Sequence, residues 1–440
     1  MMLIFKTNFV VAKFLFLNVL CGLFFFSHLS EAADSAQTSS ITIKAKQLLD
    51  VKSGEFISPA VVVIKNGLIS AVNPSTIPEN TQIIDLGEQT LLPGLIDMHT
   101  HITSDYFTSD DWTTAAVRQT SADWALQGVR FARDILAAGF TTVRDLGAQP
   151  GFPDVALMRA IEAGHMPGPD IWPAGHAISI TGGHCDSSGF APGIVELGPK
   201  SGIADGVDEA MKAVRYQSKH GVRVIKVCAT GGVFSFSQNA EIGAQQYNAN
   251  ELQAIVQEAH NLGLKVAAHA HGTKGINAAV LAGVDSIEHG SILSDESISL
   301  MKERGTFLVP QAYLNEFELS ENTPAETIAK SEYLKPLVAS SVKLAYQKGV
   351  KMAFGSDNGV FPHKDTALEF AALVRNGISE IDALRMATLY AVELLGVDDR
   401  GLLEQGKRAD IIAVSGNPLS DITSMQSVSF VMKQGVVYKD

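Results

Sequence analysis

Residues 93–101 read Pro-Gly-Leu-Ile-Asp-Met-His-Thr-His, a turn followed by an apolar segment that ends in two histidines. Leu95–Met98 is mostly apolar and follows the Pro-Gly turn, which predicts a buried strand. Because side chains alternate along a strand, His99 and His101 are expected on the same face at its C-terminal end. Two imidazoles on one rigid strand suit a divalent metal, although a His-x-His pair alone also occurs among core histidines.

From residue 93 to about residue 398 one unit recurs: an amphipathic helix, a glycine and a short apolar strand. A glycine after a helix predicts a left-handed cap, because it adopts a positive φ without the steric cost of a Cβ. The strands that follow are apolar nearly throughout, as parallel strands covered on both faces are. The glycines that mark these helix ends are Gly139, Gly263, Gly283, Gly305 and Gly349.

Eight apolar segments act as the strands of this repeat. They are residues 95–102, 141–143, 170–180, 222–230, 265–271, 285–289, 306–310 and 351–357. Eight strand–helix units predict an α/β fold, a (β/α)8 TIM barrel, in which functional groups gather at the C-terminal ends of the strands. An open, doubly wound sheet is the alternative, but no Gly-x-Gly-x-x-Gly loop follows the first strand.

Residues 33–92 and 399–440 differ from the repeat, since they combine alternating patterns with turn signals. One hairpin is expected from Ala60–Ile64 and Leu68–Val72 around Asn66-Gly67; the C-terminal segments Ala409–Val414 and Val428–Tyr438, the latter with a turn at Gln434-Gly435, have the same pattern. We expect these two ends of the chain to form one small β-sandwich domain beside a barrel of residues 93–398.

The first 32 residues have the pattern of a secretory signal peptide. Lys6 and Lys13 precede the apolar run Phe14–Phe26, and Ser30-Glu31-Ala32 supplies small residues for cleavage. The run is short for a membrane span, although an uncleaved anchor stays open. The sequence therefore predicts an exported protein, periplasmic or secreted, without a membrane segment after cleavage.

Charge and cysteine content restrict the partners. Removing residues 1–32 takes away two lysines and one glutamate, so the formal net charge of −13 becomes −14. This acidity disfavours nucleic acid and anionic lipid as partners and otherwise indicates only solubility; the partner expected from the site motifs is a small-molecule or dipeptide substrate. Cys185 and Cys228 are too few for a disulfide framework; export would permit one bond between them, but core packing is the favoured interpretation of Cys228.

Polar residues recur at the ends of the predicted strands. Lys226 lies on the interior face of its strand, where a free ammonium is costly and needs a partner or a modification. The other strands end in His269 and His271, in His289 and in Asp357. Histidines, an interior lysine and an aspartate at one end of a barrel indicate a metal centre.

Over essentially all of residues 33–440 the chain resembles the amidohydrolase superfamily. It is most similar to metal-dependent dipeptidases that include prolidase-like and Xaa-Arg/Lys carboxypeptidases, near imidazolonepropionase. The motifs that carry this resemblance are residues 93–101 (PGLIDMHTH), 180–184 (ITGGH), 225–233 (IKVCATGGV), 269–272 (HAHG), 286–290 (SIEHG), 355–357 (GSD) and 408–412 (RADII).

The resemblance implies a binuclear centre. His99, His101 and Asp357 are expected to hold one divalent ion, and His269 and His289 the other. Lys226, carboxylated by carbon dioxide, is expected to bridge them, which would replace a buried cation by an anion. Zinc suits these nitrogen and oxygen donors, and manganese or cobalt fits nearly as well.

Three residues receive further roles. Asp357 is expected to move a proton from the attacking water to the departing amine. His271 shares the strand face of His269, so the strand pattern leaves open which of the two binds metal; the resemblance favours His269 and assigns His271 to substrate contact, where prolidase-like relatives often have tyrosine. His184 follows Gly182-Gly183 at the rim of the barrel and is assigned to carbonyl polarisation or carboxylate binding.

The expected function is that of an exported metallo-dipeptidase or carboxypeptidase that releases a C-terminal residue, proline or arginine/lysine. Alternatives are a cyclic-amide hydrolase of the imidazolonepropionase kind, a deaminase, a lactonase or a phosphotriesterase, and, outside enzymes, a ligand-binding barrel without catalysis. A deaminase often has His-x-x-Glu on the fifth strand, where this chain has Gly272. Self-association of the chain stays open.

Overall fold

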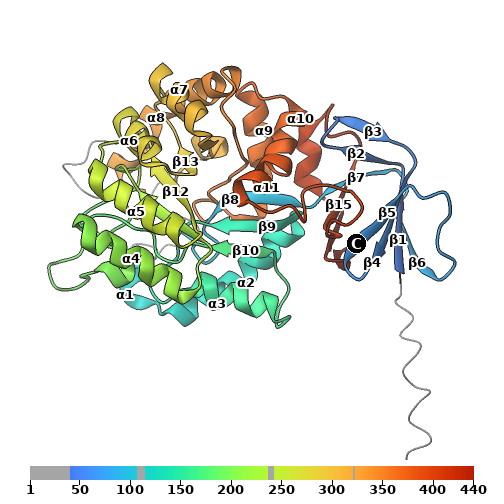
Figure 1. The fold of residues 1–440 in the computed structure, drawn as a ribbon, viewed down its shortest axis with the longest axis horizontal. Helices are drawn as coiled ribbons and strands as arrows, with labels where there is room; N and C mark the ends of the chain where they lie inside the picture. The colour runs from blue at the N-terminus through green and yellow to red at the C-terminus, as the bar shows by residue number, and fades with distance from the viewer. Residues whose placement is uncertain (1–39, 107–113, 236–241, 321–322) are drawn as a thin grey trace, which may run out of the picture. The chain divides into compact units, whose positions relative to one another are not determined.

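The structure, a computed structural model, describes residues 40–106, 114–235, 242–320 and 323–440 (Figure 1). The expected signal peptide, residues 1–32, lies outside these ranges. Among the described helices, none is long and apolar enough to cross a membrane.

The two ends of the chain form two sheets. The first has the order β5-β4-β1-β6 and consists of β1 (Ser40–Ala45), β4 (Ala60–Lys65), β5 (Leu68–Val72) and β6 (Thr81–Asp85). The second has the order β17-β16-β15-β7-β2-β3, with β2 (Gln47–Asp50), β3 (Glu55–Ile57), β7 (Gln89–Pro93), β15 (Ile411–Ser415), β16 (Phe430–Lys433) and β17 (Val436–Lys439). Since β15 runs antiparallel to β7, strands from both chain ends pair in one sheet, as expected (Figure 1).

The expected hairpins are confirmed. β4 and β5 pair antiparallel around Asn66 and Gly67, whose φ angles of 52° and 76° fit a tight turn. β16 and β17 pair around Gln434 and Gly435 in the same way. Apolar side chains from both sheets, such as Ile43 and Ile411, belong to one buried cluster.

Between these ends lie two parallel sheets. One has the order β10-β9-β8, with β8 (Leu95–Thr100), β9 (Phe140–Asp145) and β10 (Asp170–Pro173). The other has the order β11-β12-β13-β14, with β11 (Val224–Cys228), β12 (Lys265–Ala270), β13 (Ser286–His289) and β14 (Phe307–Val309). Seven of the eight predicted strands are therefore present among the described residues, mostly shorter than predicted.

The third and eighth predicted strands differ from expectation. β10 ends at Pro173, and the chain pairs again only at Ile178, which exchanges backbone hydrogen bonds of 2.8 Å with β11. Residues 351–357 form no regular strand, because Gly355 approaches Val309 closely and Asp357 has a φ of 61°. This segment still bonds to both neighbours, since Leu308 donates to the Lys351 carbonyl and Met98 to that of Phe354, each at 2.8 Å.

Helices follow the parallel strands and bury their apolar sides. Their bounds are α1 (Ala115–Arg118), α2 (Ser121–Ala137), α3 (Pro153–Glu162), α4 (Gly206–His220), α5 (Ala249–Asn261), α6 (Thr273–Ala282), α7 (Asp295–Arg304), α8 (Ala325–Gln347), α9 (Leu368–Arg375), α10 (Glu380–Met386) and α11 (Leu389–Leu395), with short 3-10 turns η2 (Pro199–Ser201), η3 (Ala312–Asn315), η4 (His363–Asp365) and η5 (Ile422–Ser427). The five glycines predicted at helix ends all have φ between 72° and 99°. The helix stops were thus predictable from glycine alone.

Candidate metal centre

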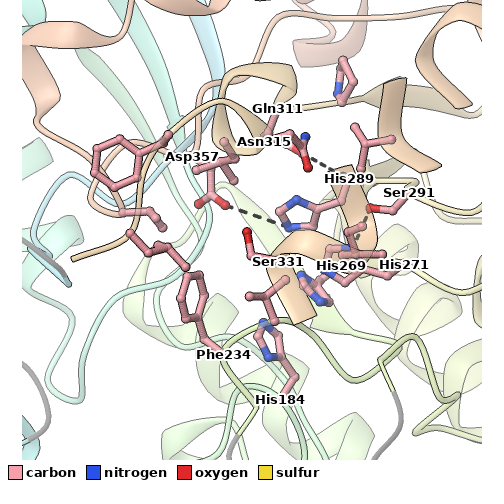
Figure 2. Close-up of a pocket in the computed structure, with 18 residues that line it drawn as sticks. His184, Phe234, His269, His271, His289, Ser291, Gln311, Asn315, Ser331 and Asp357 are labelled. Atoms are coloured by element: carbon pink, nitrogen blue, oxygen red, sulfur yellow. Dashed lines mark hydrogen bonds and ion pairs between the residues drawn. The ribbon is translucent and has the colours of Figure 1, made fainter. Parts of the chain in front are cut away.

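The side chains predicted at the strand ends meet at one place. His99 belongs to β8, Lys226 to β11, His269 to β12 and His289 to β13, while His101 and His271 each follow a strand by one residue. Two groups have potential ligand atoms within 4.8 Å of one another: His99, His101 and Asp357, and His269, His271 and His289. Figure 2 shows the second group, with Asp357 beside it.

The first group is centred on Asp357. Its Oδ1 lies 3.2 Å from Nε2 of His101 and 3.4 Å from Nε2 of His99. Lys226 joins this group, because its Nζ lies 3.4 Å from the same His99 nitrogen. The predicted ligands of the first ion are therefore in contact without any rearrangement.

Hydrogen bonds set the orientation of both rings of this group. Nδ1 of His99 lies 2.8 Å from Oε2 of Glu288, and Nδ1 of His101 lies 2.9 Å from the Gly147 carbonyl. Carboxylate and carbonyl oxygens only accept, so each ring donates from Nδ1. Nε2 of each ring then keeps its lone pair toward Asp357 and is available to a metal.

The second group consists of three buried histidines. Nε2 of His269 is buried and has no hydrogen-bond partner, whereas Nδ1 of His271 lies 2.7 Å from the Ser291 hydroxyl. His289 has a φ of 72° and donates its backbone N–H to Gln311. Nε2 of His289 lies 4.0 Å from Oδ2 of Asp357, which connects the two groups (Figure 2).

Burial controls the charges at this site. It lowers the pKa of His99, His269 and His289 well below the ordinary value, so these rings are neutral, as metal ligands must be. Burial alone would raise the pKa of Asp357, but the polar and charged groups around it, Lys226 among them, outweigh burial and bring the pKa below its ordinary range. Burial also lowers the pKa of Lys226 to about 8, against the attraction of Glu288 and Asp357.

Beneath the histidines lies a buried ion pair whose role the sequence did not reveal. Glu288 is fully buried and accepts hydrogen bonds from Arg144 at 2.8 Å and from Ser286 at 2.5 Å through Oε1. Its other oxygen contacts Nδ1 of His99 and the amide of Gln311. A glutamate and an arginine inside two predicted buried strands were the available signal, because buried charges need partners.

Glu288→Gln is expected to weaken metal binding by about 10- to 100-fold, because the acceptor that orients His99 becomes a weaker one. The apparent zinc affinity, measured against a competing chelator, tests this. Ser286→Ala is the matched control, since the Ser286 hydroxyl donates to Oε1 of Glu288 and accepts from Arg144, on the side of Glu288 away from His99. Unchanged affinity in a folded Glu288→Gln protein would contradict the orienting role.

Two cavities adjoin the histidines. The larger, of about 500 Å³, has His99, His101, Lys226 and Tyr106 among its lining residues. The smaller, of about 80 Å³, is bounded by His271 and Ser291 and by apolar side chains that include Leu314, Phe317, Leu334 and Val338 (Figure 2). His184, His269, His289 and Asp357 line both, so a ligand spanning the two cavities would pass over the metal-binding groups.

His184 is brought to this centre, as its predicted role requires. Its ring stacks on His269 with centroids 4.0 Å apart, and its Nδ1 lies 2.9 Å from the Ser235 hydroxyl. A Cβ on Gly232 would lie 2.6 Å from His184 and 2.8 Å from His269, so glycine is required beside both rings. The Thr-Gly-Gly segment after Lys226 therefore makes room for these imidazoles.

The two cysteines form a disulfide, a pairing that the sequence left open. Cys228, at the end of β11, is fully buried as expected for core packing, and it is bonded to Cys185, which directly follows His184.

Comparison with known proteins gives consistent matches. The family model described as "Amidohydrolase family" matches residues 90–438. The ochratoxinase of Aspergillus niger is 34% identical over 437 residues, covering 92% of this chain and 88% of that protein. A crystal structure of a Xaa-Pro dipeptidase with methionine bound in the active site has a TM-score of 0.86 and 36% identity, covering 91% of this chain and 100% of the other. A prolidase in complex with N-methylphosphonate-L-proline has a TM-score of 0.80 and 32% identity, covering 91% and 100%.

Proposed function

The chain belongs to the amidohydrolase family, and from its side chains at the strand ends we propose that it is an exported, binuclear metal-dependent hydrolase that cleaves amide bonds. Its preferred substrates in this proposal are dipeptides or short blocked peptides, from which it releases the C-terminal residue. The observation that carries the proposal is that His99, His101 and Asp357, with Lys226 at 3.4 Å from His99, lie beside a second group of histidines, which Asp357 connects to the first.

The donor set fits two divalent cations. Nε2 of His269 and Oδ1 of Asp357 are buried without a hydrogen-bond partner, an arrangement that costs free energy unless something binds them. His99, His101 and Asp357 would hold one ion, and His269 and His289 the other. Nitrogen and oxygen donors in this mixture suit zinc.

Lys226 supports a bridging role. It is 3% exposed, and among the described residues no carboxylate lies within ion-pair distance of its Nζ, although Glu288 and Asp357 act on it from farther away. A buried ammonium without an anion at ion-pair distance is costly, and the 3.4 Å contact with Nε2 of His99 supplies no negative charge. Carboxylation by carbon dioxide would turn Lys226 into an anion that two cations neutralise.

The residues around the ions have separate tasks. Two bound cations would supply an ionised water at neutral pH and polarise the scissile carbonyl. Asp357 lies between the two histidine groups and lines both cavities, so its carboxylate would carry the proton from the water to the departing amine. His184 and His271 would contact the substrate carbonyl or carboxylate.

The same proposal includes the architecture. Residues 93–398 would form a (β/α)8 barrel, with the bonds of residues 351–357 to β8 and β14 closing it on one side. Residues 33–92 and 399–440 would form the β-sandwich domain, for which the shared apolar cluster of the two outer sheets is the support. Residues 1–32 would be removed on export, and self-association stays a prediction.

The smaller cavity favours an apolar leaving residue over a basic one. Among its described lining residues there is no lysine or arginine, and the only carboxylate is that of Asp357. A basic side chain would need a second acid, whereas proline or another apolar side chain would pack against Leu334 and Val338. The methionine bound to the similar Xaa-Pro dipeptidase agrees with an apolar subsite.

A dipeptide panel tests the function. We expect purified protein, reconstituted with zinc and bicarbonate, to release the C-terminal residue from Xaa-Pro, Xaa-Met or Xaa-Phe with a kcat/KM at least about 10-fold above that for Xaa-Lys or Xaa-Arg. Released amino acid is measured directly. A preference for the basic substrates would contradict the assignment of the smaller cavity.

If no dipeptide of the panel is cleaved although two metal ions are bound per chain, the result would favour another hydrolase activity: that of a cyclic-amide hydrolase, a lactonase or a phosphotriesterase. Protein that binds no metal when metal is supplied would favour a ligand-binding barrel without catalysis.

A further inference from the structure

The Cys185–Cys228 disulfide joins two walls of the candidate site. Cys228 ends β11, two residues after Lys226, and Cys185 directly follows His184. The two Cα atoms lie 6.2 Å apart, although 43 positions separate the residues in the chain. The bond therefore connects the loop that carries His184 to the strand that carries the proposed bridging ligand.

Few other contacts hold this loop. Residues 184–190 all line the larger cavity. Among the described residues, the hydrogen bonds that tie this stretch to distant parts of the chain are those of His184 with Gln246 and Ser235, and Cys185 contacts Ser179 at 3.3 Å. Residues 187–190 add no such bond. The disulfide is thus the covalent attachment of a cavity wall that is otherwise weakly held.

The position of His184 tolerates little movement. Its ring stacks on His269 at 4.0 Å, and the absence of a Cβ on Gly232 leaves room for both rings. Lys226, in contrast, is held by the pairing of β11 with β12, where it lies opposite Ala267. Breaking the disulfide would therefore release His184 and leave Lys226 in place.

We propose that the Cys185–Cys228 disulfide is a positioning crosslink that holds His184 over the metal centre, which makes turnover dependent on the oxidation state of this bond. This rests on the proposed function, in which His184 contacts the substrate. An exported protein meets an environment in which such a bond persists. Cys185 and Cys228 act through His184 and do not touch the substrate chemistry themselves.

The test is a thermodynamic cycle that combines two changes, reduction of the disulfide and the substitution His184→Ala. Tris(2-carboxyethyl)phosphine gives two electrons to the S–S bond and leaves as its phosphine oxide with an oxygen from water, while each sulfur gains a proton. A phosphine avoids the metal chelation of dithiols. Reduction is expected to lower kcat/KM of the native enzyme by about 10- to 100-fold, the cost of misplacing a group by about 1 Å.

His184→Ala is expected to have a similarly lowered kcat/KM and to lose nothing further on reduction, because the residue that the bond positions is already absent. The Cys185→Ser/Cys228→Ser protein should match the reduced native enzyme and ignore the phosphine. If reduction lowers kcat/KM by the same factor in the native and the His184→Ala proteins, the proposal is overturned. The disulfide would then have a general structural role whose effect on kcat/KM is independent of His184. Assays run far below the melting temperature of each reduced protein.

A labelling experiment separates this proposal from the proposed function. Reduction should expose His184 to diethyl pyrocarbonate, and peptide mass spectrometry measures its carbethoxylation with and without the phosphine. Unchanged labelling, or two free thiols in the exported protein before reduction, would overturn the crosslink. If labelling rises but no amide substrate is cleaved, the proposed function fails and the positioning of His184 stands.

Discussion

Lys226→Ala is expected to lower kcat/KM for the best dipeptide at least about a thousandfold and to reduce bound metal from two ions toward one per chain. Nζ of Lys226 lies 3.4 Å from Nε2 of His99, and Lys226 lines the larger cavity together with histidines of both groups. Its removal would delete the proposed bridging ligand and would leave a small gap in its place. Metal content by mass spectrometry and turnover are measured on the same samples.

The gap offers a second readout. Short carboxylic acids such as formate, acetate or propionate fit the space of the missing carboxylated side chain and supply the same two oxygens. We therefore expect them to restore part of the activity of Lys226→Ala and to leave the native enzyme unaffected. Lys212→Ala is the matched control, since Lys212 is exposed on α4, and its activity should be unchanged. Undiminished turnover in Lys226→Ala would contradict the proposal that the enzyme works with two metal ions.

Asp357→Asn is expected to lower kcat by roughly two to four orders of magnitude while metal affinity falls much less. An amide keeps an oxygen that can bind a cation but cannot accept the proton. The native carboxylate is ionised throughout the neutral range, because the polar and charged groups around it hold its pKa below the ordinary range. The Asp357 carboxylate lies 3.2 Å from His101 and 4.0 Å from His289, within reach of histidines from both groups.

Rate and metal affinity must be compared in one variant. Titration with zinc against a competing chelator gives the affinity, and kcat is measured at saturating metal. Asp208→Asn, exposed on α4, controls for the loss of one negative charge. If rate and affinity fall by the same factor, Asp357 is a ligand only and another residue moves the proton.

Local patterns of the sequence were enough to predict most of the helices and strands and most of the candidate metal ligands. Glycine at positive φ ended the predicted helices, and alternation along a strand placed His99 and His101 on one face. Both signals involve only a few neighbouring residues. The same locality explains why the hairpin at Asn66-Gly67 was predictable.

Regularity of the strands was less predictable. Residues 174–180 and 351–357 were expected to extend regular strands, but they bond to their neighbours through isolated bridges. Hydrophobicity identified these segments as buried. It did not indicate that Gly355 must approach Val309 or that Asp357 must adopt a positive φ to face the histidines.

The sequence by itself determined the order of helices and strands, the family and which polar residues end the strands, because these depend on periods and motifs within short stretches. Only the tertiary structure decided that Glu288 and Arg144 pair beneath His99, that His271 joins His269 and His289, and that Cys185 bonds Cys228. These contacts join residues from different strands and loops. Their distances follow from how the sheets pack, a property of the whole folded chain.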